Sequence, residues 1–341
     1  MRVAVIGIGA MGRNHTRVYR DLPGAELVAV CDTSAEAAAE VGFRNSARAY
    51  TDHQEMLGKE QPDAVTVAVP TAHHRGIVVD ALRAGCHVLV EKPIAPSLEE
   101  ADEMIATAAG TGRLLMVGHI ERYNPAVQEL KRRLADGQLG RVFQLHARRL
   151  GPFPDRVRDV GVVVDLATHD LDVMRYLSGS GVSRVYAETR RQVHTSNEDL
   201  MTGLIRFEND TVGLLEINWL TPTKIRELTV LGEGGMLHVD YLTQELTQYK
   251  NARARVGARE LEGVSEGEVI QHQVAKGEPL KVELESFVRA VRGDAMLEVD
   301  GEDGLRALHL AQALVMSAQE GRSLDQKELS ALWRASTGHS D

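Results

Sequence analysis

The chain has 341 residues, of which 43% are hydrophobic and 26% charged, and its formal net charge is −10. This composition is typical of a folded globular protein of about two domains, and it excludes disordered, collagen-like and disulfide-scaffold proteins. The acidic balance and an aromatic content of 4% argue against a surface that binds nucleic acid, so we expect no nucleic-acid partner.

Short runs rich in β-branched residues alternate with helical patterns through the first 120 residues. Strands that are apolar on both faces and alternate with helices indicate a doubly wound, parallel α/β sheet. The expected strands are Val3–Gly7, Leu27–Cys31, Ala64–Val69, His87–Val90 and Leu114–Val117. The expected helices are Met11–Arg20, Ala35–Val41, His53–Leu57, His73–Ala84 and Leu98–Ala109.

The rhythm changes after His119, and most of the following segments read as strands separated by turns. We expect strands at Arg141–Leu150, Val185–Arg190, Met201–Phe207, Thr211–Ile217, Ile225–Leu231, Met236–Asp240 and Leu246–Tyr249. Helices are expected at Asn124–Ala135, Asp165–Leu177, Lys281–Val291 and Leu305–Ala318, with a loop at Gly151–Pro154 and an irregular polar excursion at Asn251–Gly277. The sequence therefore predicts two domains, 1–120 and 121–341, the second built on an antiparallel sheet.

The first predicted strand runs directly into a glycine-rich loop, Gly7-Ile8-Gly9-Ala10-Met11-Gly12. Glycines at these three positions allow a tight turn and a close approach of the backbone to a diphosphate, which the N-terminus of the next helix attracts. A carboxylate, Asp32, ends the second strand. Together these features predict a dinucleotide site that includes Gly7, Gly9, Ala10, Met11, Gly12 and Asp32. The alternative is a glycine turn with a solvated carboxylate.

Asp32 also bears on the choice of cofactor. Its carboxylate would accept hydrogen bonds from the ribose hydroxyls and repel a 2′-phosphate, and Thr33 and Ser34 supply no cation. We therefore expect NAD, with Thr33 beside it. Pro70, Thr71 and His74 follow the third strand and are further candidates for cofactor contacts, although His74 could equally be a core histidine.

The tripeptide Glu91-Lys92-Pro93 follows the fourth predicted strand, at the edge of the sheet where ligands bind in open α/β folds. Glu91 and Lys92 are therefore expected near the nicotinamide. A partly desolvated lysine there could act as a general base or bind substrate. The alternative is an ordinary surface lysine before a proline.

The predicted helix at Asp165–Leu177 carries Asp165, His169, Asp172 and Tyr176 on one face. His169 could move a proton near neutral pH, and Asp165 could orient it or bind a hydroxyl group. A solvated helix face explains the same pattern. Since no second cluster of ligating residues accompanies this one, we expect no metal site.

Three motifs in this order, GIGAMG at Gly7–Gly12, EKP at Glu91–Pro93 and D-x-x-x-H at Asp165–His169, resemble those of the Gfo/Idh/MocA oxidoreductases along nearly the whole chain. The resemblance implies a Rossmann domain followed by an α/β domain with a large, mostly antiparallel open sheet. It also implies that Lys92, Asp165 and His169 are catalytic and bind substrate, and that the sheet packs against a second copy in a homodimer or homotetramer.

The segment Gly118–Ala126 is similar to the corresponding segment of family members that act on nucleotide sugars, such as those that oxidise C3 of UDP-N-acetylglucosamine. That likeness implies that Tyr123 and Asn124 bind substrate. Arg156 and Arg158, which follow the Gly151–Pro154 segment, would then meet the diphosphate of the substrate, or else they are solvated loop charges.

The resulting hypothesis is an NAD-dependent oxidoreductase that moves a hydride between nicotinamide and a secondary alcohol or ketone of a sugar, in either direction. One alternative is an inositol or other free-polyol dehydrogenase. The other is a non-catalytic regulator that binds NAD.

No apolar run reaches the ~18 residues of a membrane span, the N-terminus lacks the pattern of a signal peptide, and Cys31 and Cys86 are too few for a disulfide framework. We therefore expect a cytoplasmic protein.

Overall fold

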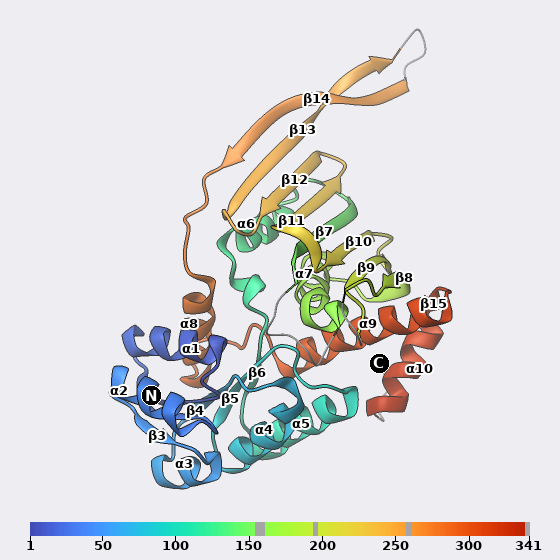
Figure 1. Ribbon diagram of the computed structural model, residues 1–341. Helices are drawn as coiled ribbons and strands as arrows, with labels where there is room; N and C mark the ends of the chain where they lie inside the picture. The colour runs from blue at the N-terminus through green and yellow to red at the C-terminus, as the bar shows by residue number, and fades with distance from the viewer. Residues whose placement is uncertain (154–160, 194–196, 257–260, 338–341) are drawn as a thin grey trace. The chain divides into compact units, whose positions relative to one another are not determined.

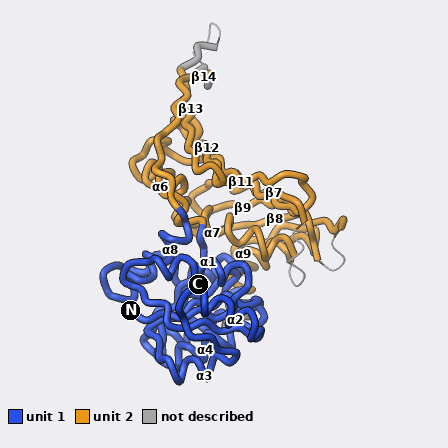
Figure 2. The backbone as a smooth tube through the Cα atoms, turned by 60° about the vertical axis from the view of Figure 1, so that its left-hand side comes forward, with its two compact units in different colours: residues 1–120, 278–309, 333–341 blue, residues 121–277, 310–332 orange. Residues whose placement is uncertain are grey.

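A computed structural model of the chain describes residues 1–153, 161–193, 197–256 and 261–337 (Figure 1). The described residues form two compact units (Figure 2). The first contains Met1–Ile120, Glu278–His309 and the described residues from Trp333 on. The second contains Glu121–Gly277 and Leu310–Leu332. Helix α8 (Pro279–Val291) and the first half of α9 (Gly301–Glu320) therefore belong to the first unit, although they follow Glu121–Gly277 in the chain.

The first unit is built on a six-stranded parallel sheet with the order β3-β2-β1-β4-β5-β6. Both faces of its central strands are buried, which explains their valine-rich, nearly continuous apolar sequences. The strands are β1 Arg2–Ile6, β2 Glu26–Cys31, β3 Arg48–Tyr50, β4 Ala64–Val67, β5 His87–Glu91 and β6 Leu115–Gly118.

Helices follow most of these strands, and three of them begin directly after a residue whose side chain accepts a backbone N–H group. Ser34, Asp52 and Ser97 cap α2, α3 and α5 in this way, which satisfies donors that have no partner inside the helix. The helices of this unit are α1 Ala10–Asp21, α2 Ala35–Arg44, α3 His53–Glu60, α4 His74–Arg83, α5 Leu98–Thr111 and α8 Pro279–Val291, with a 3₁₀ turn at Thr71–His73.

The second unit is built on a nine-stranded sheet with the order β14-β13-β12-β11-β7-β10-β9-β8-β15. Neighbouring strands are antiparallel except β7 and β10, which are parallel. The strands are β7 Val142–Pro152, β8 Val182–Arg190, β9 Leu200–Phe207, β10 Val212–Asn218, β11 Leu220–Gly232, β12 Gly235–Asp240, β13 Glu245–Val256, β14 Leu261–His272 and β15 Leu324–Asp325.

One face of this sheet is buried and the other is open. In β10 the buried residues alternate with half-buried ones, as expected for a strand with helices on one side only. The core joins the inner face to buried residues of α6, α7 and α9. The helices are α6 Pro125–Ala135, α7 Thr168–Ser178, α9 Gly301–Glu320 and α10 Gln326–Thr337, with a 3₁₀ turn at Ile120–Tyr123 and a π-helical turn at Val163–Ala167.

The parallel sheet followed by a mostly antiparallel one confirms the predicted fold class. The irregular excursion predicted at Asn251–Gly277 is wrong, because β13 and β14 pair there in a long antiparallel hairpin. Polar residues outnumber apolar ones in the sequences of both strands, so the alternation typical of a strand is not visible there. The expected loop at Gly151 is also wrong, since β7 continues to Pro152. The short strands β3 and β15 and the helix α10 were not predicted.

None of the described helices is both long and apolar enough to cross a membrane.

Candidate functional site

The glycine loop lies between β1 and α1, and its three glycines have different roles. Gly7 has a φ of +91°, and a Cβ added to it would lie 2.6 Å from the backbone of Ala68. A Cβ on Gly12 would lie 1.8 Å from the carbonyl oxygen of Gly7. A Cβ on Gly9, in contrast, would meet nothing within 4 Å. Two glycines therefore let α1 pack closely against the strand end, and the third leaves its backbone open to a ligand.

Asp32 lies directly beside this loop. Its Oδ2 accepts a hydrogen bond from the backbone N–H of Ile8 at 2.7 Å, and its Oδ1 accepts one from Ser34 at 2.8 Å. The first turn of α1 contains no acidic residue, so the positive end of the helix dipole is not neutralised. The loop therefore offers backbone donors to an anion, and the Asp32 carboxylate lies next to it.

The glycine loop and Asp32 open onto a cavity of about 1070 Å³ within the first unit. Its size suits a ligand larger than most drug-sized molecules. Of the predicted cofactor residues, Gly7, Gly9, Asp32, Thr33 and Pro70 line it. The open space over Gly9 and the positive helix end fit a bound dinucleotide. Sequence reasoning missed several lining residues, namely Thr51, His53, Ala72, Arg75 and Ile77.

Other predicted cofactor residues lie around the cavity without lining it. Ala10, Met11 and Gly12 begin α1, and Thr71 begins the 3₁₀ turn before α4. His74 is buried, and its ring nitrogens lie 3.0 Å from the carbonyl oxygen of Pro93 and 2.9 Å from that of Val69. His74 thus connects the end of β4 to the loop after β5.

Glu91 and Lys92 lie at the carboxyl end of β5, and the peptide bond between Lys92 and Pro93 is cis. Lys92 is half-buried. Glu91 is buried, and its Oε1 lies 2.7 Å from Nε2 of His15 on α1. Burial alone would raise the pKa of Glu91, but the hydrogen bond from His15 and the charge of Lys92 help to lower it below its usual value. An ionised carboxylate therefore precedes Lys92.

Asp165 and His169 belong to the second unit, whereas Lys92 belongs to the first. Asp165 is 6% exposed and lies in the π-helical turn Val163–Ala167, which leads directly into α7. His169 is half-buried on the first turn of α7. π-helical turns are rare and frequently occur at functional sites, because the extra residue redirects the side chains around it.

Two further residues of the predicted polar face have structural partners. Asp172 is fully buried, and its Oδ2 accepts a hydrogen bond from Nε of Arg122 at 2.7 Å. The ring of Tyr176 lies under two cations, 5.1 Å from Arg122 and 4.7 Å from the Nζ of Lys131. This part of the face therefore fastens α7 to the segment that leads into α6.

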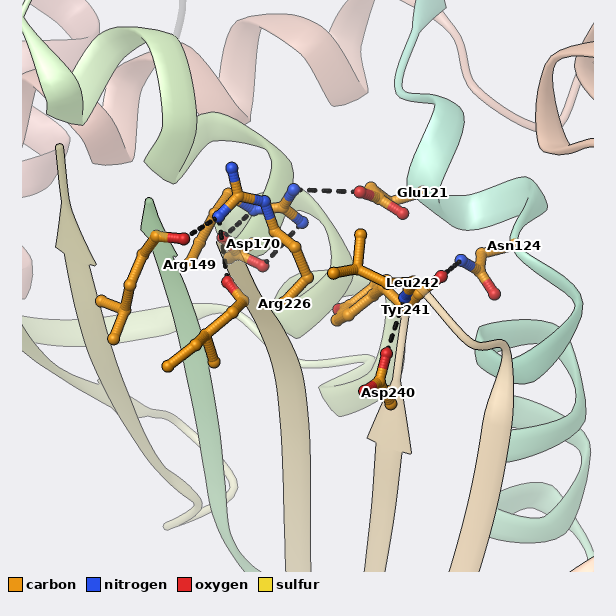
Figure 3. A network of polar contacts seen from close by, with 10 residues as sticks. Glu121, Asn124, Arg149, Asp170, Arg226, Asp240, Tyr241 and Leu242 are labelled. Carbon is orange, nitrogen blue, oxygen red and sulfur yellow. Dashed lines mark hydrogen bonds and ion pairs between the residues drawn. The ribbon is translucent and has the colours of Figure 1, made fainter. Parts of the chain in front are cut away.

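A buried polar network lies on the inner side of the second sheet, next to α7 (Figure 3). Arg149 on β7 donates to Asp170 at 2.6 Å and to Glu121 at 3.0 Å. Burial alone would lower the pKa of Arg149, and these two acids outweigh it and raise the pKa. Burial, followed by the charge of Arg149, lowers the pKa of the neighbouring Arg226 to about 10.

Asp165 lies within electrostatic range of this network, because its negative charge raises the pKa of Arg226. Arg226 is anchored by the carbonyl oxygen of Leu150, at 2.6 Å. No local sequence signal indicates the network, since its members come from four separate segments. What could have been noted is the unusual position of two arginines, Arg148 and Arg149, within an expected strand.

The predicted substrate residues Tyr123 and Asn124 are both buried. Asn124 caps α6 through Oδ1, which accepts from Ala126, and its Nδ2 donates to the carbonyl oxygen of Tyr241 at 3.1 Å. Its amide is thus already engaged within the fold. Arg156 and Arg158 lie outside the described residues.

Comparison with protein-family models gives two matches that together span most of the chain. Residues 1–119 match the model described as "Oxidoreductase family, NAD-binding Rossmann fold". Residues 127–238 match the model described as "GFO/IDH/MocA C-terminal domain".

Curated relatives and solved structures agree with these models. The chain is 33% identical over 311 residues to UDP-N-acetylglucosamine 3-dehydrogenase from Acidithiobacillus ferrooxidans, covering 91% of this chain and 95% of that protein. The structure of that protein superposes with a TM-score of 0.83, covering 94% and 98% of the two chains at 32% identity. The chain is also 26% identical to myo-inositol 2-dehydrogenase from Thermotoga maritima, covering 96% and 99%.

One further solved structure carries ligands in its description. It is the WlbA dehydrogenase from Bordetella pertussis in complex with NADH and UDP-GlcNAcA. It superposes with a TM-score of 0.79 at 26% identity and covers 95% of this chain and 98% of its own.

Proposed function

The chain belongs to the GFO/IDH/MocA oxidoreductases and is an NAD-dependent enzyme acting on CH–OH groups, and we propose that its substrate is a UDP-linked sugar oxidised at C3. The observation that carries this proposal is the 33% identity to a UDP-N-acetylglucosamine 3-dehydrogenase over 91% of the chain. The WlbA structure, described with a UDP-sugar acid, supports the same class of substrate.

NAD supplies the hydride acceptor at the nicotinamide ring. The residues of this chain provide the rest of the proposed chemistry. The backbone at Gly9 and the start of α1 hold the diphosphate, and Asp32 holds the ribose. Lys92 takes the hydroxyl proton or passes it on, Asp165 holds the substrate hydroxyl, and His169 is the second candidate for the general base. The same residues serve the reverse reduction of a ketosugar.

A free polyol is the second candidate substrate, since a myo-inositol 2-dehydrogenase matches 96% of the chain. The two candidates differ in charge, because a UDP-sugar brings a diphosphate and a polyol does not. A panel of UDP-sugars and free polyols with NAD, followed by NADH absorbance, separates them. Turnover of UDP-N-acetylglucosamine or a close relative supports the proposal, and turnover of polyols alone overturns it.

The proposed role of Lys92 is tested by Lys92→Ala. Hydride transfer should fall by several orders of magnitude, whereas NAD should still bind with nearly unchanged affinity, as measured by calorimetry. Lys59→Ala is the matched control, because Lys59 is exposed on α3 and pairs with Glu55 one turn away. If Lys92→Ala turns over normally, Lys92 is not the catalytic lysine. A chain that binds NAD and turns over no alcohol would instead support a regulator.

We propose that the open face of the second sheet packs against another copy of this chain. Leu231 pairs with Met236, Met236 with Tyr249, and Tyr249 with Val269, so these side chains form a row across β11 to β14. Leu231, Tyr249 and Val269 are 39%, 40% and 63% exposed. Exposed apolar rows of this kind are typical of subunit interfaces.

Light scattering of Leu231→Arg/Tyr249→Glu tests this interface. The double variant should be a monomer where the wild type is an oligomer. Leu242→Glu serves as the control, because Leu242 is 57% exposed in the turn after β12 and lies outside the row. An unchanged mass of the double variant would exclude this face as the interface.

A further inference from the structure

Glu283 on α8 is a fully buried carboxyl group that the proposed chemistry does not use. It is 0% exposed, and neither carboxylate oxygen has a hydrogen-bond partner among the described residues. A buried polar group without a hydrogen-bond partner destabilises the folded state, and more so if it is charged. The position of Glu283 therefore requires an explanation beyond packing.

The surroundings of Glu283 are the buried face of α1 and the end of β5. Helix α8 packs against α1, on which His15 and Tyr19 are buried one turn apart. Burial raises the pKa of Tyr19, and the charge of Glu283 adds to this effect. Burial, followed by the charge of Glu91, raises the pKa of Glu283 well above its usual range. Glu283 therefore lies within electrostatic reach of both Tyr19 and Glu91.

Glu91 has a fixed position in this cluster. Its Oε1 lies 2.7 Å from Nε2 of His15, and its Oε2 lies over Gly118, where an added Cβ would come within 3.3 Å of that oxygen. Lys92 and His74 are the other charged or titratable groups that act on Glu91. The other nitrogen of His15, Nδ1, is buried without a hydrogen-bond partner among the described residues.

These contacts determine the direction of the hydrogen bonds. An ionised Glu91 can only accept, so Nε2 of His15 carries a hydrogen. In a neutral imidazole Nδ1 is then an acceptor and needs a donor. A neutral carboxylic acid at Glu283 has one O–H to donate, and a buried water suits a group of three orphaned polar atoms in one interior region.

We propose that Glu283 is a neutral positioning residue whose O–H, through buried water, donates toward Nδ1 of His15, while Nε2 of His15 donates to the Glu91 carboxylate. This chain of hydrogen bonds keeps a single negative charge on Glu91, directly before Lys92 in the sequence. It goes beyond the proposed function and does not depend on which alcohol the enzyme oxidises.

The opposite arrangement has the same number of protons, with an imidazolium at His15 between two carboxylates. Infrared difference spectroscopy at pH 7 distinguishes the two. The spectrum of the wild type minus that of Glu283→Gln should contain the C=O stretch of a protonated carboxylic acid. Glu285→Gln is the matched control, because Glu285 lies two residues further along α8, is 45% exposed and pairs with Lys281. This control should leave the band in place.

The tautomer of His15 gives an independent measurement in the NAD-free and NAD-bound enzyme. Nitrogen NMR of protein labelled at histidine should show His15 as the neutral form protonated at Nε2, identified by the signal that His15→Gln removes. Glu283→Gln should move the Nδ1 resonance, and Glu285→Gln should not. Absence of the acid band in the wild type, or an imidazolium at His15 at pH 7, overturns the proposal. A failure of the substrate assignment would change neither spectrum.

Discussion

The carboxylate of Asp32 accepts a hydrogen bond from the backbone N–H of Ile8 at 2.7 Å, so the acid that ends β2 is fastened to the glycine loop itself. Its other oxygen accepts from Ser34 at the start of α2. Each carboxylate oxygen has a further lone pair, so these bonds leave acceptors for the ribose hydroxyls. Asp32 therefore shapes the loop, and we propose that it also selects the cofactor.

Replacing Asp32 should change the choice of cofactor. Asp32→Ser removes the charge that repels a 2′-phosphate and weakens the hold on the NAD ribose. We expect the ratio of kcat/KM for NAD to that for NADP to fall about 10- to 100-fold, on the order of one or two charge-assisted hydrogen bonds. Asp32→Asn is the control for the loop, because it keeps an oxygen for the Ile8 N–H. A wild type that already prefers NADP would contradict this interpretation.

Replacing Gly12 with alanine should destabilise the fold, whereas replacing Gly9 with alanine should weaken NAD binding. Gly12→Ala places a Cβ 1.8 Å from the Gly7 oxygen, so the loop must shift and we expect a lower Tm, with a loss of about 1–3 kcal/mol or more. Gly9→Ala meets nothing within 4 Å, so it should keep the Tm and lose NAD affinity. Differential scanning fluorimetry with and without NAD measures both. Equal NAD affinity of Gly9→Ala and wild type would show that the diphosphate does not approach Gly9.

The buried ion pair between Arg149 and Asp170 predicts a strong dependence of stability on both partners. Asp170→Asn leaves a buried guanidinium with Glu121 as its negatively charged partner, and we expect a loss of about 3–5 kcal/mol in urea unfolding. The exposed pair of Arg206 and Asp210 provides the control, since Asp210→Asn should change stability by less than about 1 kcal/mol. Similar losses of unfolding free energy for Asp170→Asn and Asp210→Asn would mean that burial does not increase the contribution of an ion pair to stability.

The sequence allows prediction of those features that residues close together in the chain determine. The glycine loop, Asp32 and the EKP segment each occupy one strand end, so local pattern was sufficient. Arg149 and Asp170 come from β7 and α7, and no local signal pairs them. In β13 and β14 polar residues outnumber apolar ones, so the sequence shows no regular apolar alternation there. The burial of Glu283 is indicated by the sequence, because Glu283 shares a helix face with Leu280 and Phe287, both buried.

The pH dependence of stability should reveal Glu283. Its pKa is raised in the folded state, so the unfolded chain releases this proton at lower pH than the folded chain does. The stability associated with Glu283 is therefore complete below about pH 4.5 and is lost as pH rises toward the folded pKa. The loss is at most about 1.4 kcal/mol per pH unit. Glu283→Gln has no such proton, so its Tm relative to wild type should rise as pH increases from 5 to 8.

Glu91 contributes with the opposite sign, because its pKa is lowered in the folded state and its stabilisation is lost as pH falls through that value. The two carboxyl groups can therefore be separated in one set of melting curves. Glu91→Gln should lose its deficit relative to wild type at acidic pH, whereas Glu283→Gln should gain its advantage at alkaline pH. Glu285→Gln, at an exposed site on the same helix, should follow the wild-type curve. Parallel curves for Glu283→Gln and wild type would mean that Glu283 is ionised in the folded protein.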